Sequence, residues 1–228
     1  MALSLSGKTG DLEPLLSAAL SDLHLAADRK GRGRILAYVS LLQRWNAVHN
    51  LTGTQDAEEL LQQHVVDCLA IIGPLRRHAG DRALTVLDAG TGAGLPAVIV
   101  AILQPNWTVA AVDAVGKKVA FLRQVCGDLG LTNLHPRHER LERLSPHEGA
   151  FGVVTCRAFS SLSQFVEATR HVIEPTGVWL AMKGRRPETE IRDLPTDCQL
   201  FHVEPVTVPG LHAERCLVWM KPTNESNA

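Results

Sequence analysis

The clearest chemical signal in the sequence is a glycine-rich segment that follows a short apolar run. It reads Asp88-Ala89-Gly90-Thr91-Gly92-Ala93-Gly94. Glycines allow positive φ angles and let a ligand approach the main chain, and the free amides of a following helix favour an anionic or polar group. Asp113 ends the next apolar run, at a position where a carboxylate accepts hydrogen bonds from both hydroxyls of a ribose. The pattern predicts a binding site for a nucleotide-type ligand.

Two ligands compete for this loop. The segment from Gly92 to Ala97 fits the dinucleotide template G-x-G-x-x-A, but it starts one step late relative to the strand end and places Pro96 inside the phosphate turn. A D-x-G-x-G-x-G segment that starts at the strand end suits S-adenosylmethionine, which has no pyrophosphate and whose ammonium group favours a nearby carboxylate. We therefore assign four loop residues to this cofactor: Asp88, Gly90, Gly92 and Gly94. A tight turn that binds no ligand is the remaining interpretation.

The elements around this loop alternate between short strands and helices. Strands are expected at 84–87, 108–112, 151–155 and 178–182, with a weaker one near Leu134, and helices at 95–103, 117–129 and 162–172. Such alternation predicts a parallel sheet. Two last runs, 199–206 and 216–220, are joined by a turn region at Pro209-Gly210 without a helix, so we expect them to pair antiparallel at the sheet edge.

The first third of the chain is predicted to be helical. Apolar residues recur every three or four positions from Leu12 to Leu23 and again from Ile35 to Trp45, on either side of an Arg/Gly-rich break at 28–34. A third helix is expected over 57–72 and should stop at Gly73-Pro74. We divide the chain into a helical extension (1–75) packed on the core, a cofactor-binding core (76–222) and a disordered tail (223–228).

Composition narrows the class of protein. The chain has 228 residues, 45% of them apolar, and a net charge of -1, which excludes a protein that coats nucleic acid through overall basicity. The longest apolar stretch, 95–103, is about half of the ~20 residues that a membrane-spanning helix needs, and Asp11 and Glu13 interrupt any signal-peptide core. The five cysteines follow no metal-ligand or disulfide spacing. We expect a cytoplasmic monomer without a metal.

With these residues in hand, the chain resembles the glucose-inhibited division protein B family, bacterial methyltransferases that act on a guanine N7 of 16S ribosomal RNA in the small subunit. The resemblance runs in order over about 35–220. The matching segments are Trp45-Asn46, Asn50-Leu51-Thr52, His64 with Asp67, 87–96, 113–118, 121–125, Arg140-Leu141-Glu142, Arg157-Ala158-Phe159, Lys183-Gly184 and Glu214-Arg215. The chain departs from the family at three positions. Ala93 stands where the family usually has proline, Ala97 where it often has glycine, and Cys156 where it usually has serine.

The resemblance implies a fold and a set of site residues. The fold is the class I S-adenosylmethionine-dependent methyltransferase fold, Rossmann-like, with a mostly parallel seven-stranded sheet and an antiparallel last strand, preceded by the helical extension. The residues implied to line the cofactor site are Gly90, Leu95, Asp113, Leu141 and Glu142. Those implied to face the RNA, and taken here as catalytic, are Arg140, Arg157 and Lys183.

Other candidates have plainer interpretations. One basic cluster is interpreted as a solvated loop or as an RNA contact; it consists of Arg29, Lys30, Arg32 and Arg34. A second cluster, Lys183 with Arg185 and Arg186, is expected at the mouth of the inferred site. His49 and His64 are taken as structural. Cys156 suggests a nucleophile for pyrimidine methylation, but free cysteine at a strand end is usually a small core residue.

Three functions remain open at this point. The first is methyl transfer to guanine N7, which already carries an in-plane lone pair and has no proton to lose, so that positioning is enough. The second is an NAD(P)-dependent oxidoreductase on a Rossmann sheet. The third is a non-catalytic RNA-binding module that keeps the fold.

Overall fold

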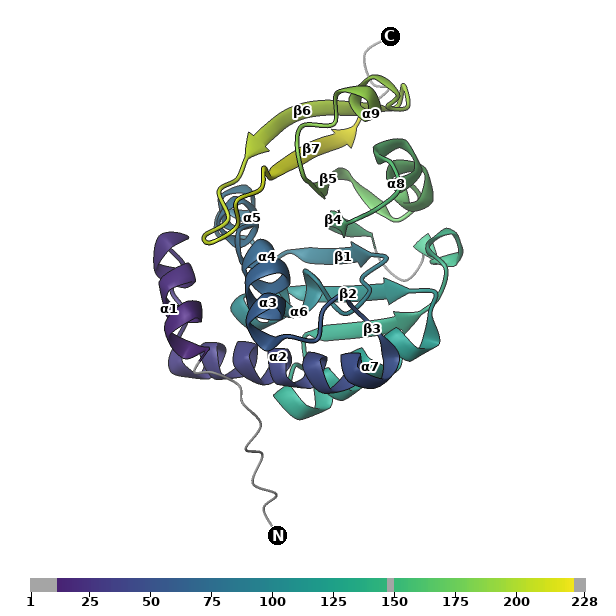
Figure 1. Ribbon diagram of the computed structural model, residues 1–228. Helices are drawn as coiled ribbons and strands as arrows, with labels where there is room; N and C mark the ends of the chain where they lie inside the picture. The colour runs from purple at the N-terminus through teal and green to yellow at the C-terminus, as the bar shows by residue number, and fades with distance from the viewer. Residues whose placement is uncertain (1–11, 147–149, 224–228) are drawn as a thin grey trace.

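Seven strands form a single twisted sheet in the computed structural model, which describes residues 12–146 and 150–223 (Figure 1). The strand order is β3-β2-β1-β4-β5-β7-β6. The strands are β1 (Thr85–Ala89), β2 (Thr108–Asp113), β3 (Leu134–His138), β4 (Phe151–Arg157), β5 (Ile173–Lys183), β6 (Cys198–Pro205) and β7 (Cys216–Pro222). β1 to β5 are parallel, and β7 runs antiparallel between β5 and β6. The predicted sheet and its antiparallel final hairpin are confirmed.

Helices cover both faces of the sheet (Figure 1). One face carries α1 (Glu13–Asp22), α2 (Arg29–His49), α3 (Ala57–Glu59), the π-helix η1 (Leu60–Val66), α4 (Asp67–Leu69), α5 (Ile72–Ala79), α6 (Ala97–Leu103) and α7 (Gly116–Leu129). The other carries the 3-10 turn η2 (Leu141–Arg143), α8 (Leu162–Thr169) and α9 (Glu188–Arg192).

Strand periodicity sorts the core into two clusters. Val86 and Val109 belong to the cluster beneath the larger helical layer, and their neighbours Leu87 and Ala110 belong to the cluster on the opposite face. This alternation is what a two-residue side-chain period produces in a sheet covered on both sides. All seven residues of α6 are buried, as the uniformly apolar sequence of that segment predicts.

Two helix boundaries predicted from the sequence are wrong. The Arg/Gly-rich segment 28–34 is not a break, because α2 begins at Arg29 and the Asp28 carboxylate caps it by accepting a hydrogen bond from the Gly31 amide (2.7 Å). Gly73-Pro74 does not stop a helix either. It lies in the first turn of α5, where a proline without an N–H removes no helical hydrogen bond.

The N-terminal helices share one core with the sheet. α2 packs on α6 and α7, and the buried Tyr38 of α2 donates a hydrogen bond to the Ala93 carbonyl in the glycine loop (2.8 Å). The helical layer therefore helps to fix the glycine loop. The division into a helical extension and a core near residue 75 stays a prediction. Residues 224–228 of the predicted tail lie outside the described residues.

Candidate functional site

The glycine loop has the backbone geometry that its composition predicts. Gly90, Gly92 and Gly94 all have positive φ angles, of 67°, 60° and 93°. Asp113 at the end of β2 anchors the loop, because its Oδ2 accepts a hydrogen bond from the Gly92 amide (2.9 Å) and its Oδ1 accepts one from the Val115 amide (2.8 Å). The loop and the second carboxylate thus form one unit at the carboxyl edge of the sheet.

Asp88 lies beneath the loop. Its side chain is fully buried, and Oδ2 accepts hydrogen bonds from Thr91 Oγ1 (2.6 Å) and from the Ala97 amide (3.2 Å). Burial raises the pKa of this carboxyl group to about 6, against the opposing effect of those two hydrogen bonds. Asp88 therefore holds the loop against the start of α6, and its Oδ1 has no partner among the described protein atoms.

The remaining residues assigned to the cofactor lie at the same edge. Leu95 is buried at the end of the loop. Arg140, Leu141 and Glu142 follow β3 and open the 3-10 turn η2, with Arg140 and Glu142 exposed and Leu141 half-buried against the second core cluster. Asp113 pairs in register with His138, the last residue of β3, so these residues stand next to the glycine loop across the sheet edge.

Arg157, the last residue of β4, is held by a carboxylate from the helical layer. Asp67, on α4, contacts two arginines. Its Oδ2 lies 3.4 Å from Arg157 Nη1, and its Oδ1 accepts a hydrogen bond from Arg215 Nε (2.8 Å). His64 Nδ1 lies 3.3 Å from the same Arg157 nitrogen. The pKa of His64 is lowered by burial and then by Arg157, which favours a neutral ring that accepts from the guanidinium.

These side chains border a cavity of about 470 Å³. Its walls come from the N-terminal helical layer and from the ends of β4 and β5, and they include Gln63, His64, Asp67, Arg157, Lys183 and Arg215. The segment after Arg157 connects the cavity to the cofactor loop: Ala158 has a φ of 58°, and a Cβ built on Gly90 would lie 3.9 Å from the Phe159 ring. The cavity and the glycine loop are therefore neighbours.

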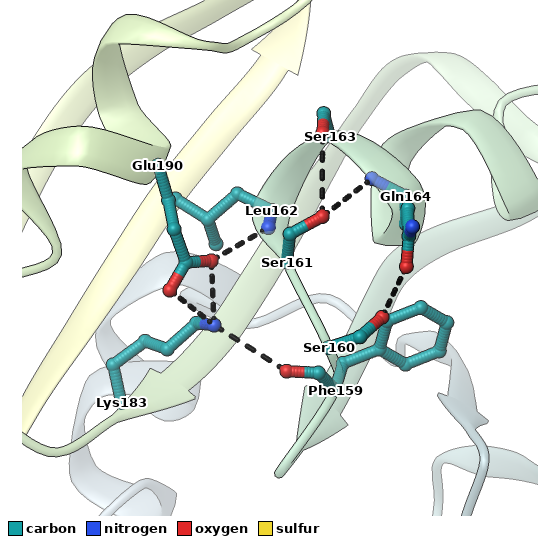
Figure 2. Close-up of polar contacts among 8 residues, drawn as sticks. All are labelled: Phe159, Ser160, Ser161, Leu162, Ser163, Gln164, Lys183 and Glu190. Atoms are coloured by element: carbon teal, nitrogen blue, oxygen red, sulfur yellow. Dashed lines mark hydrogen bonds and ion pairs between the residues drawn. The ribbon is translucent and has the colours of Figure 1, made fainter.

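Lys183, at the end of β5, is ion-paired rather than free (Figure 2). Its Nζ lies 2.7 and 3.0 Å from the two carboxylate oxygens of Glu190 on α9 and 3.5 Å from the Phe159 carbonyl. Glu190 also accepts a hydrogen bond from the Leu162 amide at the start of α8 (2.8 Å). The Lys183 side chain is 14% exposed, so it borders the cavity as part of a fixed network that spans α8, α9 and the β4–α8 loop.

Cys156 is a core residue. Its side chain is buried in the second cluster, and burial raises the pKa of the thiol well above its usual value. A protonated, buried thiol is a poor nucleophile, in agreement with the interpretation of Cys156 as packing. All five cysteines are free.

Three positioning side chains received no role in the sequence interpretation: Asp67, Glu190 and Arg215. Asp67 had a readable signal, because it is an acidic residue within an apolar helical stripe that includes Val65 and Cys68, and a buried carboxylate needs a charged partner. Arg215 stood in a segment that matches the family, Glu214-Arg215, but without a role. Glu190 had no comparable signal, since charged residues in a short polar segment are common.

Comparison with known proteins places the chain in a family. The model of the family GidB, described as rRNA small subunit methyltransferase G, matches residues 33–218. The chain belongs to the GidB family. Ribosomal RNA small subunit methyltransferase G of Leptothrix cholodnii is 48% identical over 194 residues, which are 85% of this chain and 88% of that protein. The protein of the same name from Acidovorax ebreus is 46% identical over 219 residues, or 92% and 96% of the two chains.

Solved structures agree on the fold. Magnesium protoporphyrin IX methyltransferase from Synechocystis PCC 6803 with bound SAM has a TM-score of 0.55 at 18% identity, covering 86% of this chain and 98% of that one. TrmN from Thermus thermophilus has a TM-score of 0.53 at 21% identity and covers 66% of this chain; the match spans about half (48%) of TrmN. Together with the sheet order, these matches confirm the class I methyltransferase fold expected for a GidB member.

The site geometry fits the cofactor of a GidB methyltransferase, S-adenosylmethionine. The loop carries three glycines with positive φ angles beside the Asp113 carboxylate. Beneath the loop, the buried Oδ1 of Asp88 has no hydrogen-bond partner among the residues that the structure describes. Neither the oxidoreductase nor the non-catalytic module is supported by these matches. No helix in the described ranges 12–146 and 150–223 could span a membrane, and no cluster of His, Cys, Asp or Glu within them is arranged to hold a metal ion.

Proposed function

We propose that this GidB member transfers a methyl group from S-adenosylmethionine to N7 of a guanine in the 16S ribosomal RNA of the small subunit. The observation that carries the proposal is the cavity of about 470 Å³ beside the glycine loop, bordered by Arg157, Arg215 and Lys183. Cations at this edge suit a substrate that brings phosphates and a guanine O6. The assignment of ribosomal RNA as the substrate comes from the name of the relatives, ribosomal RNA small subunit methyltransferase G.

Cofactor binding is assigned to the loop and its two neighbours at the sheet edge. The main-chain amides of the loop and the Asp113 carboxylate are the polar groups for the amino-acid and ribose parts, and Leu141 with Glu142 borders the base. The residues proposed to contact the cofactor or support its loop are Asp88, Gly90, Gly92, Gly94, Leu95, Asp113, Leu141 and Glu142. When bound, S-adenosylmethionine supplies an electrophilic methyl group on a sulfonium.

The protein needs to position the guanine rather than activate it. Guanine N7 has an in-plane lone pair and no proton, so no general base is required, and holding the two reacting atoms in line at about 3 to 3.5 Å accounts for much of the rate enhancement. Arg157 is the proposed contact to O6 or a phosphate, because Asp67 and His64 fix its guanidinium at the cavity wall. Lys183 is the second proposed RNA contact, because it borders the cavity, and it also supports the Phe159 segment. The exposed Arg140 is the third proposed RNA contact.

A direct test is methylation of small ribosomal subunits and of protein-free 16S RNA, followed by mass mapping of the modified nucleotide. Both RNA substrates should be taken from a strain that lacks the enzyme. The expected product is one 7-methylguanine, and methylation of a pyrimidine or of an exocyclic amine would contradict the proposal. We further propose that the enzyme acts as a monomer in the cytoplasm, where ribosomal subunits are available.

A further inference from the structure

A second cavity continues from the first. It has a volume of about 820 Å³ and lies between the segment after β5 and the connection from β6 to β7. The two cavities share Gly184, Leu211 and Arg215 as lining residues. The two cavities are therefore adjacent, and a nucleotide chain whose target guanine occupies the first cavity passes close to the second.

The charge of this second cavity is locally positive. Among the described residues, its lining includes three arginines, Arg185, Arg186 and Arg215, and one acidic side chain, Glu214. Arg215 is already paired with Asp67 (2.8 Å), so Arg185 and Arg186 supply the charge that is open to a ligand. Arg185 is exposed and makes no ion pair with any residue of the described chain, 12–146 and 150–223. Within the described part of the chain, Arg186 pairs with Glu188, and both of those side chains are more than half exposed (52% and 67%). Exposed pairs of this kind are worth little and are readily exchanged for a phosphate.

Most of the remaining lining is apolar, and Thr207 and His212 are polar side chains within it. Val206, Val208 and Leu211 come from the β6–β7 connection and face the same cavity as the arginines. Proteins hold single-stranded nucleic acid in positively charged grooves that follow the phosphates, with side chains beside them that contact the bases. In this cavity aliphatic side chains lie where stacking aromatic residues are usual. Since the whole chain has a net charge of -1, such a local groove has to supply the attraction for RNA.

We infer that this second cavity is a groove for the single-stranded RNA that flanks the target guanine, with phosphates at Arg185 and Arg186 and bases against the β6–β7 connection. The inference rests on the proposed function and adds to it the path of the RNA. It also assigns a role to the β6–β7 connection, which lies outside the cofactor site.

The test compares two double variants that each remove two positive charges. Arg185→Ala with Arg186→Ala changes the groove. Arg82→Ala with Arg170→Ala is the control, because both residues are exposed and shortly precede β1 and β5, at the edge of the sheet opposite to the carboxyl edge.

The groove variant should raise the KM for small subunits about tenfold at 0.15 M salt and reduce the slope of log KM against log salt concentration by roughly one to two units. Its kcat and its affinity for S-adenosylhomocysteine should stay within twofold of the parent, and the control should match the parent throughout. An unchanged KM, or an equal rise in the control, overturns the inference.

Crosslinking separates a failure of the groove from a failure of the proposed function. 16S RNA containing 4-thiouridine is irradiated with the parent enzyme, and the attached peptides are mapped by mass spectrometry. Crosslinks within 203–216 support the groove whether or not methylation is seen, while crosslinks confined to other segments overturn it. If the parent enzyme crosslinks within 203–216 but transfers no methyl group, the proposed function is refuted and the groove is not.

Discussion

Gly94 and Leu122 leave no room for a side chain between them. A Cβ built on Gly94 would lie 2.5 Å from Leu122 Cδ2 and 2.6 Å from Val98 Cγ2, both closer than atoms of a folded protein approach. The glycine loop is thus packed directly on α7 and on the first turn of α6. Gly94 supports the cofactor site through this packing, in addition to any contact that its own main chain makes with the cofactor.

Gly94→Ala is expected to destabilise the fold by about 2 to 4 kcal/mol, because the substitution combines a strained φ of 93° with overpacking. Gly92→Ala is the matched control. It also has a positive φ (60°), but its new Cβ would meet no atom closer than 4.0 Å, so it should cost only about 1 to 2 kcal/mol. Urea unfolding of both variants checks the difference, and equal losses would show that α6 and α7 move apart at little cost.

Asp113→Asn should weaken S-adenosylhomocysteine binding at least tenfold, because the loss of charge weakens hydrogen bonds from ribose hydroxyls. The side chain keeps its size but can accept from only one of the two amides, Gly92 or Val115, that the carboxylate holds, so urea unfolding of the same preparation checks that the fold is kept. Asp128→Asn, the same change at the exposed far end of α7, is the control and should bind as the parent does. Calorimetric titration measures both affinities; an unchanged affinity for Asp113→Asn would remove this residue from the cofactor site.

Arg157→Ala is expected to abolish most methyl transfer while the affinity for S-adenosylhomocysteine stays within a few-fold, because its guanidinium borders the substrate cavity. Lys183→Ala should also lower the rate, by releasing Glu190 and the Phe159 segment that it holds. Single-turnover methylation and calorimetry on the same preparations separate the two effects. Equal losses of activity and of cofactor affinity would place Arg157 in the cofactor pocket instead.

Cys156→Ser should leave single-turnover methylation within about one order of magnitude of the parent, which corresponds to about 1.4 kcal/mol in the barrier. Serine nearly preserves the volume of the buried thiol and removes its nucleophilicity. A loss of several orders of magnitude in a folded variant, or a covalent protein–RNA adduct that survives denaturation, would indicate pyrimidine chemistry.

Asp88 should make stability depend on pH in a direction opposite to that of an ordinary carboxylate. Burial raises its pKa from 3.8 to about 6, so folding takes up a proton between these values and the contribution of Asp88 to stability falls as the pH rises through this window. The free energy of unfolding of Asp88→Asn relative to the parent should therefore increase from pH 4 to pH 7, on the order of 2 kcal/mol. Urea unfolding at several pH values measures this difference, and a flat difference would contradict the raised pKa.

The periodicity of the sequence was sufficient to predict the sheet and the position of its carboxyl edge, whereas the RNA-facing roles of Arg140, Arg157 and Lys183 came from the family resemblance. Apolar runs separated by helical stretches define the strands, and each strand delivers its last residue, such as Asp113 or Arg157, to the same edge. Partners far apart in the chain could not be predicted in this way. Asp67 meets Arg157 and Arg215 across separations of 90 and 148 positions, and nothing local to any of the three specifies that meeting.

The misplaced helix boundaries have a local physical cause. At 28–34 two glycines suggested a break, but the Asp28 carboxylate caps the helix and α2 tolerates both glycines within its first turns. At Gly73-Pro74 the proline was interpreted as an end, although the same residue is favourable at a beginning. Both errors arise because caps and first-turn residues outweigh average helix propensity.

The π-helix η1 at Leu60–Val66 sets the direction in which the next helical turn faces. Each π-type hydrogen bond spans one residue more than an α-type bond, so this segment takes up one residue more than a regular α-helix would. If the same residues were wound as a continuous α-helix, those that follow would rotate by about 100° relative to those before the segment, and Asp67 would turn away from Arg157 and Arg215. The π-helix therefore gives up regular helical geometry and in return aims a carboxylate at the active edge.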